Sequence, residues 1–385
     1  MIFHPHSLSH FALECTFVWS YPSPNRDGDL DAEVMLHEYT HGLSDRLVGG
    51  GVGISAFQTA GMAEGWSDFY ALASLSEPGD DVNANYSAAG YVTYQWFGLA
   101  ENYYYGIRRY PYTTDLNKNP LTFKDIDANQ ADPHAGVPIS PNVGITISPD
   151  PSEVHNQGEV WCATLWEARA NLIARYGYAA GNDLILQLVT DAMNLCPANP
   201  NFIQARDAIL QADVVNTWGE NQYDLWLAFA KRGMGLGATA PDSSTTVGVV
   251  ESFDLPPVVR VSPVWPHWID ENSGYNTFTI SRTGPTTSPL YSVTFYLGGD
   301  GECDAHYPED FSTSGCYQAP FPNAFYVNMP SGQDHVDVNI QAIDDDELEC
   351  YYEAVTPTVP FVPTSFGYVV DPGARVAPTY IIDND

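Results

Sequence analysis

The segment His37-Glu38-Tyr39-Thr40-His41 constrains this chain more than any other feature of its sequence. If the segment is helical, its two histidines are four residues apart and lie on one face, about one turn from each other. Two imidazoles placed in this way can bind one tetrahedral zinc ion, and Glu38 projects beside them as a base for a water molecule. The alternative is a helix with two surface histidines that bind nothing.

A catalytic zinc ion needs a third protein ligand, and the next helical segment offers one. Glu64 lies in the sequence GMAEGWSDFYAL, and Asp68 stands one helical turn after it. We expect Glu64 to be the third ligand, and Asp68 to accept the free ring N–H of a zinc-bound histidine and so fix its tautomer. Taken alone, Glu64 fits a partly exposed helix acid equally well, but its combination with His37, His41 and Asp68 favours the metal site.

The charge of the chain excludes several classes of function. The 385 residues carry a formal net charge of −34, so the chain has little with which to neutralise nucleic-acid phosphates or to bind an anionic membrane. No apolar run approaches the about 18 residues of a membrane span. The first residues, MIFHPHSLSH, lack the basic cluster and apolar block of a signal peptide.

Two regions of different character follow one another along the chain. The first predicts helices, and residues 106–151 between them, rich in Pro, Asn, Asp and Gly, predict an extended surface loop. After a small, polar stretch, short runs of alternating apolar and polar residues predict an antiparallel β-sandwich that contains no lysine. The expected domains are residues 1–236, a linker at 237–255, and residues 256–385. The expected helices cover 29–43, 61–75, 153–176, 178–196, 202–213 and 224–231, and the clearest strands cover 277–282, 292–297, 324–329 and 336–342.

The motifs of the first region resemble the fungalysin family of secreted metallopeptidases, which are relatives of thermolysin. The matching segments are RDGDLDAEV, HEYTHGLSDRLVGG, GMAEGWSDF, IRRYPYTTDLNKNPLTF, HNQGEVWCATLWEARANLI, CPANPNFIQARDAILQAD and LWLAFAKRGMG. The resemblance covers roughly residues 18–237. It implies a mainly α-helical, thermolysin-like catalytic lobe with one zinc ion bound by His37, His41 and Glu64, and with Glu38 as the general base.

The same resemblance implies a role for His155, a histidine that precedes the long GEVW helix. In such enzymes this histidine lies across the zinc from the base and donates a hydrogen bond to the oxyanion of the tetrahedral intermediate. Arg109, in the sequence RRYPY, fits a structural role or a substrate-facing one, and the sequence does not choose between them.

The resemblance also raises an expectation about what precedes this chain. Thermolysin-like enzymes have a β-rich lobe before the helical one, and residues 1–28 are too short to form it. We therefore expect this chain to be the C-terminal portion of a longer secreted precursor, with the N-terminal β lobe, the signal peptide and an inhibitory pro-segment encoded upstream.

The second region resembles a Calx-β domain, over roughly residues 256–385. The resemblance rests on IDENSGYNTFTISRTG, the YPEDF segment, VDVNIQAIDDDELE and the closing YIIDND. It implies a calcium site, because Ca²⁺ takes 6–8 oxygen ligands and several carboxylates recur at the expected strand ends. A solvated acidic surface is the competing explanation. The implied calcium ligands are Glu271, Asp310, Asp344, Asp345, Asp383 and Asp385.

The leading hypothesis is a secreted zinc endopeptidase that acts on proteins or peptides, with a calcium-binding accessory domain. The alternative is a non-catalytic, calcium-dependent binding or adhesion protein that retains a peptidase scaffold. A different zinc hydrolase chemistry on the same helix is a third option, which the length of the fungalysin resemblance disfavours. The six cysteines suit an exported protein, and we expect Cys303 and Cys316 to form a local disulfide.

Overall fold

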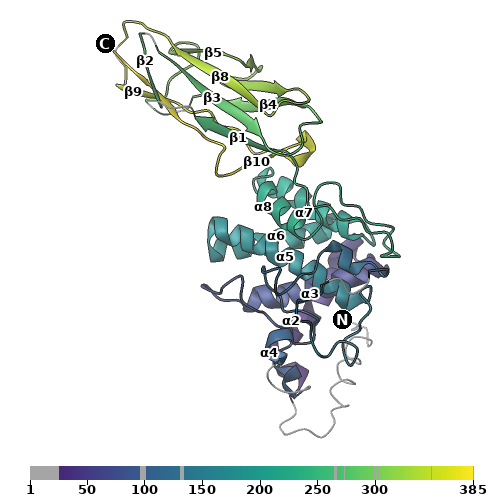
Figure 1. Ribbon diagram of the computed structural model, residues 1–385. Helices are drawn as coiled ribbons and strands as arrows, with labels where there is room; N and C mark the ends of the chain where they lie inside the picture. Colours follow the sequence, from purple (N-terminus) through teal and green to yellow (C-terminus); the bar gives the residue numbers. More distant parts are fainter. Residues whose placement is uncertain are drawn as a thin grey trace. The chain divides into compact units, whose positions relative to one another are not determined.

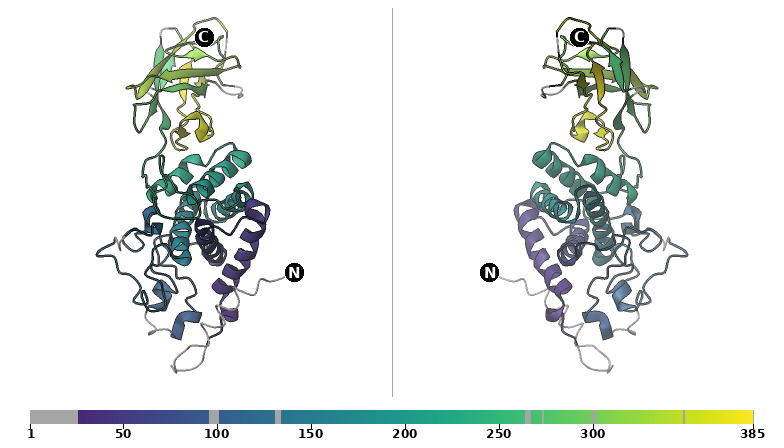
Figure 2. Two further views of the ribbon diagram at one scale, coloured as in Figure 1. Left: turned by 90° about the vertical axis from the view of Figure 1, so that its right-hand side faces the viewer. Right: turned by 90° about the vertical axis from the view of Figure 1, so that its left-hand side faces the viewer.

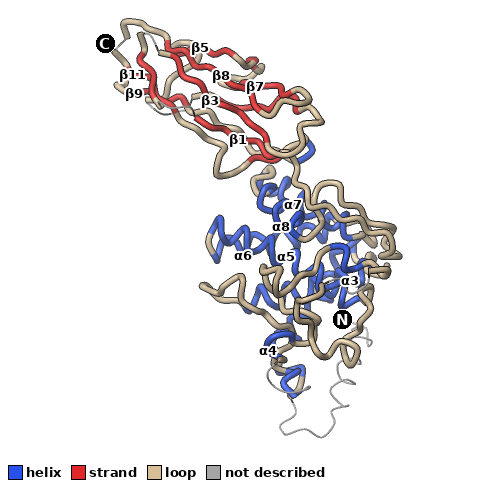
Figure 3. Tube along the Cα trace, viewed as in Figure 1, coloured by secondary structure: helices blue, strands red, loops and turns tan. Residues whose placement is uncertain are grey.

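The structure is a computed structural model that describes residues 26–95, 101–130, 134–263, 267–272, 274–298, 301, 303–347 and 349–384. The chain divides into two compact units. Unit 1 comprises Met1–Asp213 with Asp224–Asp254, and unit 2 comprises Val214–Tyr223 with Leu255–Asp385. Unit 1 is mainly helical and unit 2 is built mainly of strands (Figures 1 and 3). The prediction of a helical region followed by an all-β region is therefore confirmed.

Three helices that contact one another form the centre of unit 1. The α3 helix (Phe57–Leu75) packs against both α2 (Ala32–Leu47) and α5 (Val154–Tyr176), and Figure 2 shows these helices running alongside one another from two further sides. Each predicted helix is present with small shifts at its ends. The remaining helical elements are α4 (Asn102–Tyr105), α6 (Tyr178–Leu195), α7 (Phe202–Thr217), α8 (Gln222–Lys231), and the 3-10 turns η1 (Gly28–Leu30), η2 (Val48–Gly50), η3 (Val92–Gln95) and η4 (Phe123–Ile126).

Glycines bring the backbones of α3 and α5 into close contact. A Cβ atom at Gly65 would lie 2.6 Å from the carbonyl oxygen of Gly158 and 2.7 Å from Cβ of Trp161, and one at Gly158 would lie 2.6 Å from Cβ of Glu64. Real Cβ atoms do not approach so closely, so both positions require glycine. This contact sets the position of Glu64 relative to α5.

The predicted surface loop at residues 106–151 is wrong in one respect, because much of it is buried. Tyr112 and Phe123 are fully buried and Tyr110 is nearly so. Backbone carbonyls in this segment accept hydrogen bonds from Arg232, which is itself completely buried and also pairs with Glu167. The Pro- and Asn-rich pattern correctly indicated irregular backbone. It carries no information on Arg232, which is distant in sequence and supplies the hydrogen bonds that these buried carbonyls require.

Residues 237–254, which fall within the expected linker, belong to unit 1. The buried Gln58 amide donates to the carbonyl oxygen of Thr245 at 2.6 Å, and the Gln58 backbone N–H donates to that of Ser243 at 2.8 Å. Thr239 and Val250 form a short antiparallel bridge. A small polar composition is typical of linkers, and here the same residues are held by backbone hydrogen bonds.

The described strands of unit 2 form three sheets. The largest has the strand order β10-β1-β3-β8-β5, and two smaller ones have the orders β2-β11-β9 and β4-β7-β6. The pairs β1–β10 and β2–β11 are parallel, and the other paired strands are antiparallel. The strands are β1 (Val258–Pro263), β2 (Trp268–Asp270), β3 (Tyr275–Arg282), β4 (Leu290–Tyr296), β5 (Phe311–Ser314), β6 (Tyr317–Gln318), β7 (Ala324–Met329), β8 (His335–Ala342), β9 (Tyr352–Val355), β10 (Val369–Val370) and β11 (Thr379–Ile382), with the 3-10 turn η5 (Thr364–Phe366).

One hydrophobic core joins the sheets of unit 2. Phe278 on β3, Phe295 on β4 and Phe325 on β7 are buried in it, with ring centroids 5.5 Å apart for the first pair and 5.8 Å for the second. Alternate residues of β3 are buried, as the alternating sequence predicts.

The expected disulfide between Cys303 and Cys316 is wrong. Cys303 instead pairs with Cys350, with their Cα atoms 5.4 Å apart, and Cys316 is a free thiol. Proximity in sequence favoured the local pair. In the fold, however, β9 lies next to Cys303, because the Ala354 N–H donates to the Cys303 carbonyl and the Ala305 N–H donates to the Ala354 carbonyl.

Within the described residues, no helix is long and apolar enough to cross a bilayer.

Replacing Arg232 with methionine is expected to destabilise unit 1 by about 3–5 kcal/mol, because it leaves the buried Glu167 carboxylate and several carbonyls without their donor. The salt bridge from Lys231 to Glu167, at 2.8 Å, places the expected loss at the lower end of that range. Urea unfolding followed by circular dichroism at 222 nm measures the change, since helix is concentrated in unit 1. Arg46→Met, at an exposed position of α2, serves as the control and is expected to stay within about 0.5 kcal/mol. Equal effects of the two variants would contradict the role of Arg232.

Candidate metal centre and active site

The α2 helix presents His37 and His41 on one face. The helix begins at Ala32 because the Asp31 side chain accepts hydrogen bonds from the backbone N–H groups of Glu33 and Val34. The spacing of four residues then brings the Nε2 atoms of the two imidazoles to within 3.1 Å of each other. Two ring nitrogens that converge in this way face a common point, as the sequence predicted.

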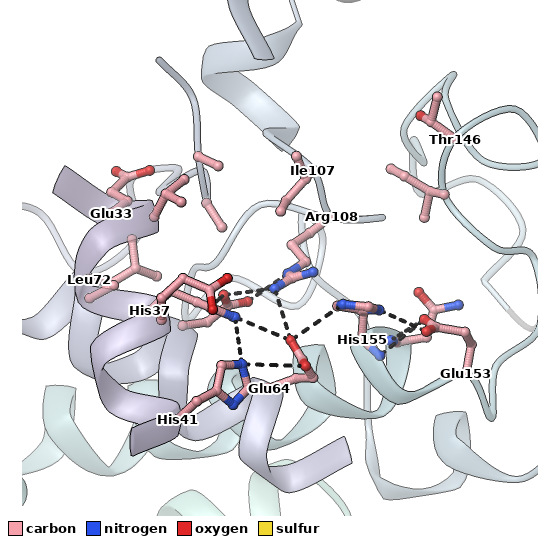
Figure 4. A pocket seen from close by; sticks show the side chains of 18 of the residues that line it. Glu33, His37, His41, Glu64, Leu72, Ile107, Arg108, Thr146, Glu153 and His155 are labelled. Atoms are coloured by element: carbon pink, nitrogen blue, oxygen red, sulfur yellow. Dashed lines mark hydrogen bonds and ion pairs between the residues drawn. The ribbon is translucent and has the colours of Figure 1, made fainter. Parts of the chain in front are cut away.

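Glu64, on α3, completes a group of three candidate ligands. Its Oε2 lies 3.2 Å from Nε2 of His37, and its Oε1 lies 3.5 Å from Nε2 of His41. One candidate ligand atom from each of the three residues lies within 4.8 Å of the others. Figure 4 shows the three side chains pointing toward one another from α2 and α3.

The chemistry of this group fits a zinc ion. Oε2 of Glu64 is buried and accepts no hydrogen bond, which is costly for a carboxylate oxygen unless a cation satisfies it. Burial lowers the pKa of His41 to about 4, so this imidazole is neutral at pH 7 and keeps a free lone pair. Burial acts to lower the pKa of His37, but the adjacent carboxylates of Asp68 and Glu64 raise it to about 9, so zinc would displace a proton from this ring on binding. Two imidazole nitrogens and one carboxylate form a known ligand set of catalytic zinc sites.

Asp68 orients His37 from the far side of the ring. Its Oδ1 lies 2.8 Å from Nδ1 of His37, and its two oxygens accept hydrogen bonds from Arg108 at 2.7 and 2.9 Å and another from the hydroxyl of Tyr112. Burial alone would raise the pKa of Asp68, but Arg108 and the bond from His37 hold it well below its ordinary value. An ionised Asp68 makes Nδ1 the protonated nitrogen, so the lone pair of Nε2 faces Glu64 and His41.

Arg108 and Tyr112 were missed in the sequence. The pair RRYPY drew attention to Arg109, which is buried and holds Glu159 at 3.0 Å and the carbonyl oxygen of Asn156 at 2.8 Å, a structural role. Its neighbour Arg108 is the one that reaches the site. Tyr112 is one of 24 tyrosines, and no local signal distinguishes it from the others.

Glu38 and His155 line the same cavity as the three candidate ligands, a space of about 410 Å³. Burial raises the pKa of Glu38 above its ordinary value, which favours its action as a base that both accepts and returns a proton. His155 lies at the start of α5, with its Nε2 3.5 Å from Oε2 of Glu64. The structure thus brings together the predicted zinc ligands, Asp68, Glu38 and His155, whereas Arg109 does not line the cavity.

Glu153 holds His155 in place and was also missed. Its side chain caps α5 by accepting from the backbone N–H groups of His155 and Asn156, and its Oε1 lies 2.7 Å from Nδ1 of His155. Burial acts to lower the pKa of His155, but Glu153 and Glu64 raise it above the ordinary value. This ring is therefore turned with Nε2 toward the cavity, as Figure 4 shows.

Unit 2 contains a cluster of carboxylates that only partly matches the predicted calcium ligands. Oxygens of Asp310, Glu349 and Glu353 lie within 4.8 Å of one another. Burial, then the charge of Asp310, raises the pKa of Glu353 to about 8. Glu349 and Glu353 were not among the predicted ligands, because the sequence does not reveal that Glu353 is buried on β9.

The other predicted calcium ligands lie near one another or outside the described residues. The side-chain amide of Asn384 donates to Glu271 at 3.1 Å and to Asp344 at 3.0 Å, and Asp383 accepts from the backbone N–H of Glu349 at 3.0 Å. Asp345 is exposed, and its Oδ1 accepts from the backbone N–H of Glu347. Asp385 is not among the described residues.

Comparison with known proteins identifies the family of the helical region. Residues 13–238 match the model of the fungalysin metallopeptidase family, M36. This chain belongs to that family. Membership implies a zinc cofactor, in agreement with the ligand set described above.

Curated relatives of this fungalysin chain are fungal proteins. It is 41% identical over 238 residues to an extracellular metalloproteinase, mep, of Aspergillus fumigatus, with 58% of this chain and 33% of that protein covered. It is 40% identical, over the same length, to extracellular metalloproteinase MEP of Neosartorya fischeri and to extracellular metalloproteinase 1 of Trichophyton equinum, covering 58% of this chain and 33% and 34% of those proteins. The chain spans about a third of the length of these relatives.

Solved structures with some similarity to this chain include a crystal structure of the apo-form Calx CBD1 domain. It is 23% identical to this chain and covers 34% of this chain and 99% of its own, with a TM-score of 0.25. The CBD12 structure from CALX1.2 is 23% identical with a TM-score of 0.24, and covers 34% of this chain and 45% of its own. At these scores the similarity carries no argument about fold or function.

The hydrogen bond between Asp68 and His37 leads to a prediction about zinc affinity. Asp68→Asn removes the charge that holds the proton on Nδ1 of His37, so zinc affinity is expected to fall by about 10–100-fold. Competition with a chromogenic chelator measures the dissociation constant, and near-ultraviolet circular dichroism checks that the fold is retained. Asp183→Asn, at an exposed position of α6, is the control for loss of one negative charge. An unchanged affinity in folded Asp68→Asn would contradict the orienting role.

Proposed function

We propose that this chain carries the catalytic centre of an extracellular zinc endopeptidase that hydrolyses peptide bonds of protein or peptide substrates. His37, His41 and Glu64 would hold the single zinc ion. The observation that carries the proposal is the convergence of two imidazole Nε2 atoms on the carboxylate of Glu64, whose buried Oε2 accepts no hydrogen bond. The names of the relatives, which are extracellular metalloproteinases, support both the activity and the location.

The residues around His37, His41 and Glu64 would have different roles in hydrolysis. A zinc ion bound there would supply a Lewis acid that lowers the pKa of water and polarises the scissile carbonyl. Glu38 takes a proton from the attacking water and returns it to the leaving amine. His155, held by Glu153, donates a hydrogen bond from Nε2 to the oxygen that becomes negative as the carbonyl carbon turns tetrahedral. His37 is buried and the Glu64 side chain is only 15% exposed, which limits access of bulk water and strengthens these interactions.

The domain assignment is part of the same proposal. Residues 1–236 would form a thermolysin-like catalytic lobe, 237–255 a connection, and 256–385 a β-sandwich of the Calx-β type. The shared core of the unit 2 sheets supports a sandwich, and the Cys303–Cys350 disulfide is consistent with an oxidising, extracellular environment.

The role of Glu38 as the general base can be tested with a variant of the same shape that cannot accept a proton. Glu38→Gln is expected to bind zinc as tightly as the parent but to lower kcat/KM for peptide hydrolysis by about 100-fold or more, because an amide cannot accept the proton of water. Zinc content and cleavage of a fluorogenic peptide are measured on the same sample. Tyr39→Phe, at the exposed next position of α2, is the control. Equal hydrolysis by Glu38→Gln would refute this mechanism, and a parent chain that binds zinc without hydrolysing any peptide would favour the non-catalytic alternative.

The proposed hydrogen bond to the oxyanion predicts a different signature for His155. His155→Phe is expected to lower kcat by about 100–1,000-fold with little change in KM, since the interaction forms only in the transition state. Steady-state kinetics on the same peptide separate the two parameters. A rise in KM with unchanged kcat would assign His155 to substrate binding instead.

A calcium site in unit 2 is the second function that we propose. The supporting observation is the raised pKa of Glu353, which lies with Asp310 and Glu349 in a cluster where like charges oppose one another. A divalent cation would turn this repulsion into ligation. The nearby acids Glu271, Asp344, Asp345 and Asp383 would contribute further oxygens, together with Asp385.

Calcium is therefore expected to raise the melting temperature of unit 2, by mass action on the folded state alone. Differential scanning calorimetry of the full chain, in calcium and in calcium-depleted buffer with zinc held constant, measures the shift. Glu353→Gln is expected to melt higher than the parent without calcium and to gain less from the ion. Glu309→Gln, which removes an exposed neighbouring charge, controls for net charge. If calcium does not change the melting temperature of the parent, the calcium site is refuted and these acids form a solvated acidic surface.

A further inference from the structure

The small sheet β4-β7-β6 of unit 2 has an outer face that carries tyrosines. Tyr326 on β7 lies opposite Thr294 on β4 and opposite Tyr317 on β6. Residues directly opposite one another in antiparallel strands lie on the same face of a sheet, so these three side chains form a row across the three strands. The alternate residues Phe295 and Phe325 are buried in the core of unit 2, which shows that the row lies on the face turned away from that core.

The tyrosine rings of this face contact one another and remain accessible. The ring centroids of Tyr317 and Tyr326 are 5.2 Å apart, and the ring planes differ by only 20°. Tyr317 is 58% exposed, and Tyr296, two residues after Thr294 on β4, is 43% exposed. A group of neighbouring exposed aromatic rings is typical of an interaction site, because covering such rings removes a large apolar area from water.

A β-bulge in β4 adds exposed side chains next to this row. The pairing register with β7 shifts between Leu290 and Val293, and Ser292 within the bulge has a φ of 55°, in the left-handed region. The backbone N–H of Ser292 donates to Oδ1 of Asn328 on β7 at 2.9 Å. Successive residues of a regular strand face opposite sides, whereas here both Tyr291 and Ser292 are exposed. Bulges are frequent next to functional sites, where they redirect side chains.

The segments that build this sheet contain no charged residue. Residues 283–298 include β4, residues 311–333 include β6 and β7, and neither stretch contains Asp, Glu, Lys, Arg or His. On its other side β4 is joined by a bridge between Tyr296 and Thr358, and Thr358 lies in a third uncharged stretch, residues 354–370. Charged residues make up 16% of the chain, which has a net charge of −34, so this face differs in charge from the chain as a whole.

We infer that the outer face of the β4-β7-β6 sheet binds an uncharged polysaccharide. A sugar ring packs its C–H groups against the face of an aromatic ring, while its hydroxyl groups donate and accept hydrogen bonds at the edge. Tyr296, Tyr317 and Tyr326 supply the rings, and the hydroxyls of Ser292 and Thr294 supply neutral donors and acceptors. The inference goes beyond the proposed peptidase and does not depend on it, because every residue involved belongs to unit 2.

The distribution of charge favours this occupant over others. A cationic partner would be attracted to the acidic parts of the chain instead of to a face without charge, and an anionic partner would be repelled by the net charge of −34. A neutral polysaccharide is subject to neither effect. Protein interfaces are typically enriched in Arg and Met as well as in aromatic residues, whereas the exposed residues identified on this face are tyrosines with small neutral polar side chains.

The test measures how much of the full chain is removed from solution by insoluble cellulose and by insoluble chitin, which are uncharged, and by chitosan, the cationic counterpart of chitin. Glu38→Gln is present throughout, so that the chain does not cleave itself. At least one of the two uncharged polysaccharides is expected to retain the chain, and its soluble hexasaccharide, cellohexaose or N-acetylchitohexaose, is expected to release it. Retention by neither would overturn the inference. Retention by chitosan alone would do the same, since it would report only the negative charge of the chain.

Variants of the tyrosines locate the binding face. Tyr317→Ala and Tyr296→Ala are each expected to weaken retention by about ten-fold, because an aromatic ring at the centre of a binding face contributes much of the affinity. Tyr317→Phe, which keeps the ring, is expected to retain most of it. Tyr275→Ala, which removes a 69% exposed ring from β3 in another sheet of unit 2, is the control and is expected to bind like the parent. Calorimetric melting temperatures check that each variant is folded. Unchanged retention in both Tyr317→Ala and Tyr296→Ala, or an equal loss in Tyr275→Ala, would overturn the inference.

A second copy of this chain is the competing occupant of the face. Sedimentation equilibrium of the parent and of Tyr317→Ala, without any polysaccharide, measures self-association. The inference expects the same mass for both proteins. A dimer that Tyr317→Ala dissociates, together with no retention by cellulose or chitin, would assign the face to self-association and overturn the inference.

Discussion

The candidate metal centre depends on one buried carboxylate, that of Asp68. It accepts hydrogen bonds from His37 on α2, from Arg108 and from Tyr112, so a single side chain of α3 joins a helix to the irregular segment that follows α4. Two guanidinium hydrogen bonds keep this acid ionised in a dry environment. Its charge then decides which nitrogen of His37 carries the proton, and hence where the lone pair of the other nitrogen points.

The geometry of the site follows from how closely the helices pack. Because Gly65 and Gly158 let α3 and α5 touch, Glu64 on α3 comes within reach of His155 at the start of α5. The separate packing of α3 against α2 brings Glu64 close to His37 and His41. The irregular segment between α4 and α5 also positions the site. Arg232 donates hydrogen bonds to carbonyl oxygens of this segment, and Tyr112 in the same segment is buried. Structural residues far from the cavity therefore fix the positions of the residues that line it.

Much of the site could be predicted from the sequence because its key spacings lie within single helices. His37, Glu38 and His41 are ordered by one helical turn, and Glu64 and Asp68 by another, so local periodicity alone aligns them. Arg108 and Tyr112 belong to irregular backbone, where no period indicates direction, and attention fell on Arg109 instead. The prediction of Cys316 as the disulfide partner of Cys303 was wrong for a similar reason. Cys316 is near in sequence, but the fold places Cys350 next to Cys303.

The sequence by itself determined the class of chemistry, the helical and β regions, and the residue types that can bind zinc. These depend on the order of residues within segments, which local hydrogen bonding and hydrophobic periodicity translate directly into helices and strands. Only the tertiary structure decided that an irregular segment is buried and that Glu353 lies close to Asp310 and Glu349. Each of these depends on which distant side chain supplies, or fails to supply, the opposite charge or the hydrogen bond, and that is set by packing between segments remote in sequence.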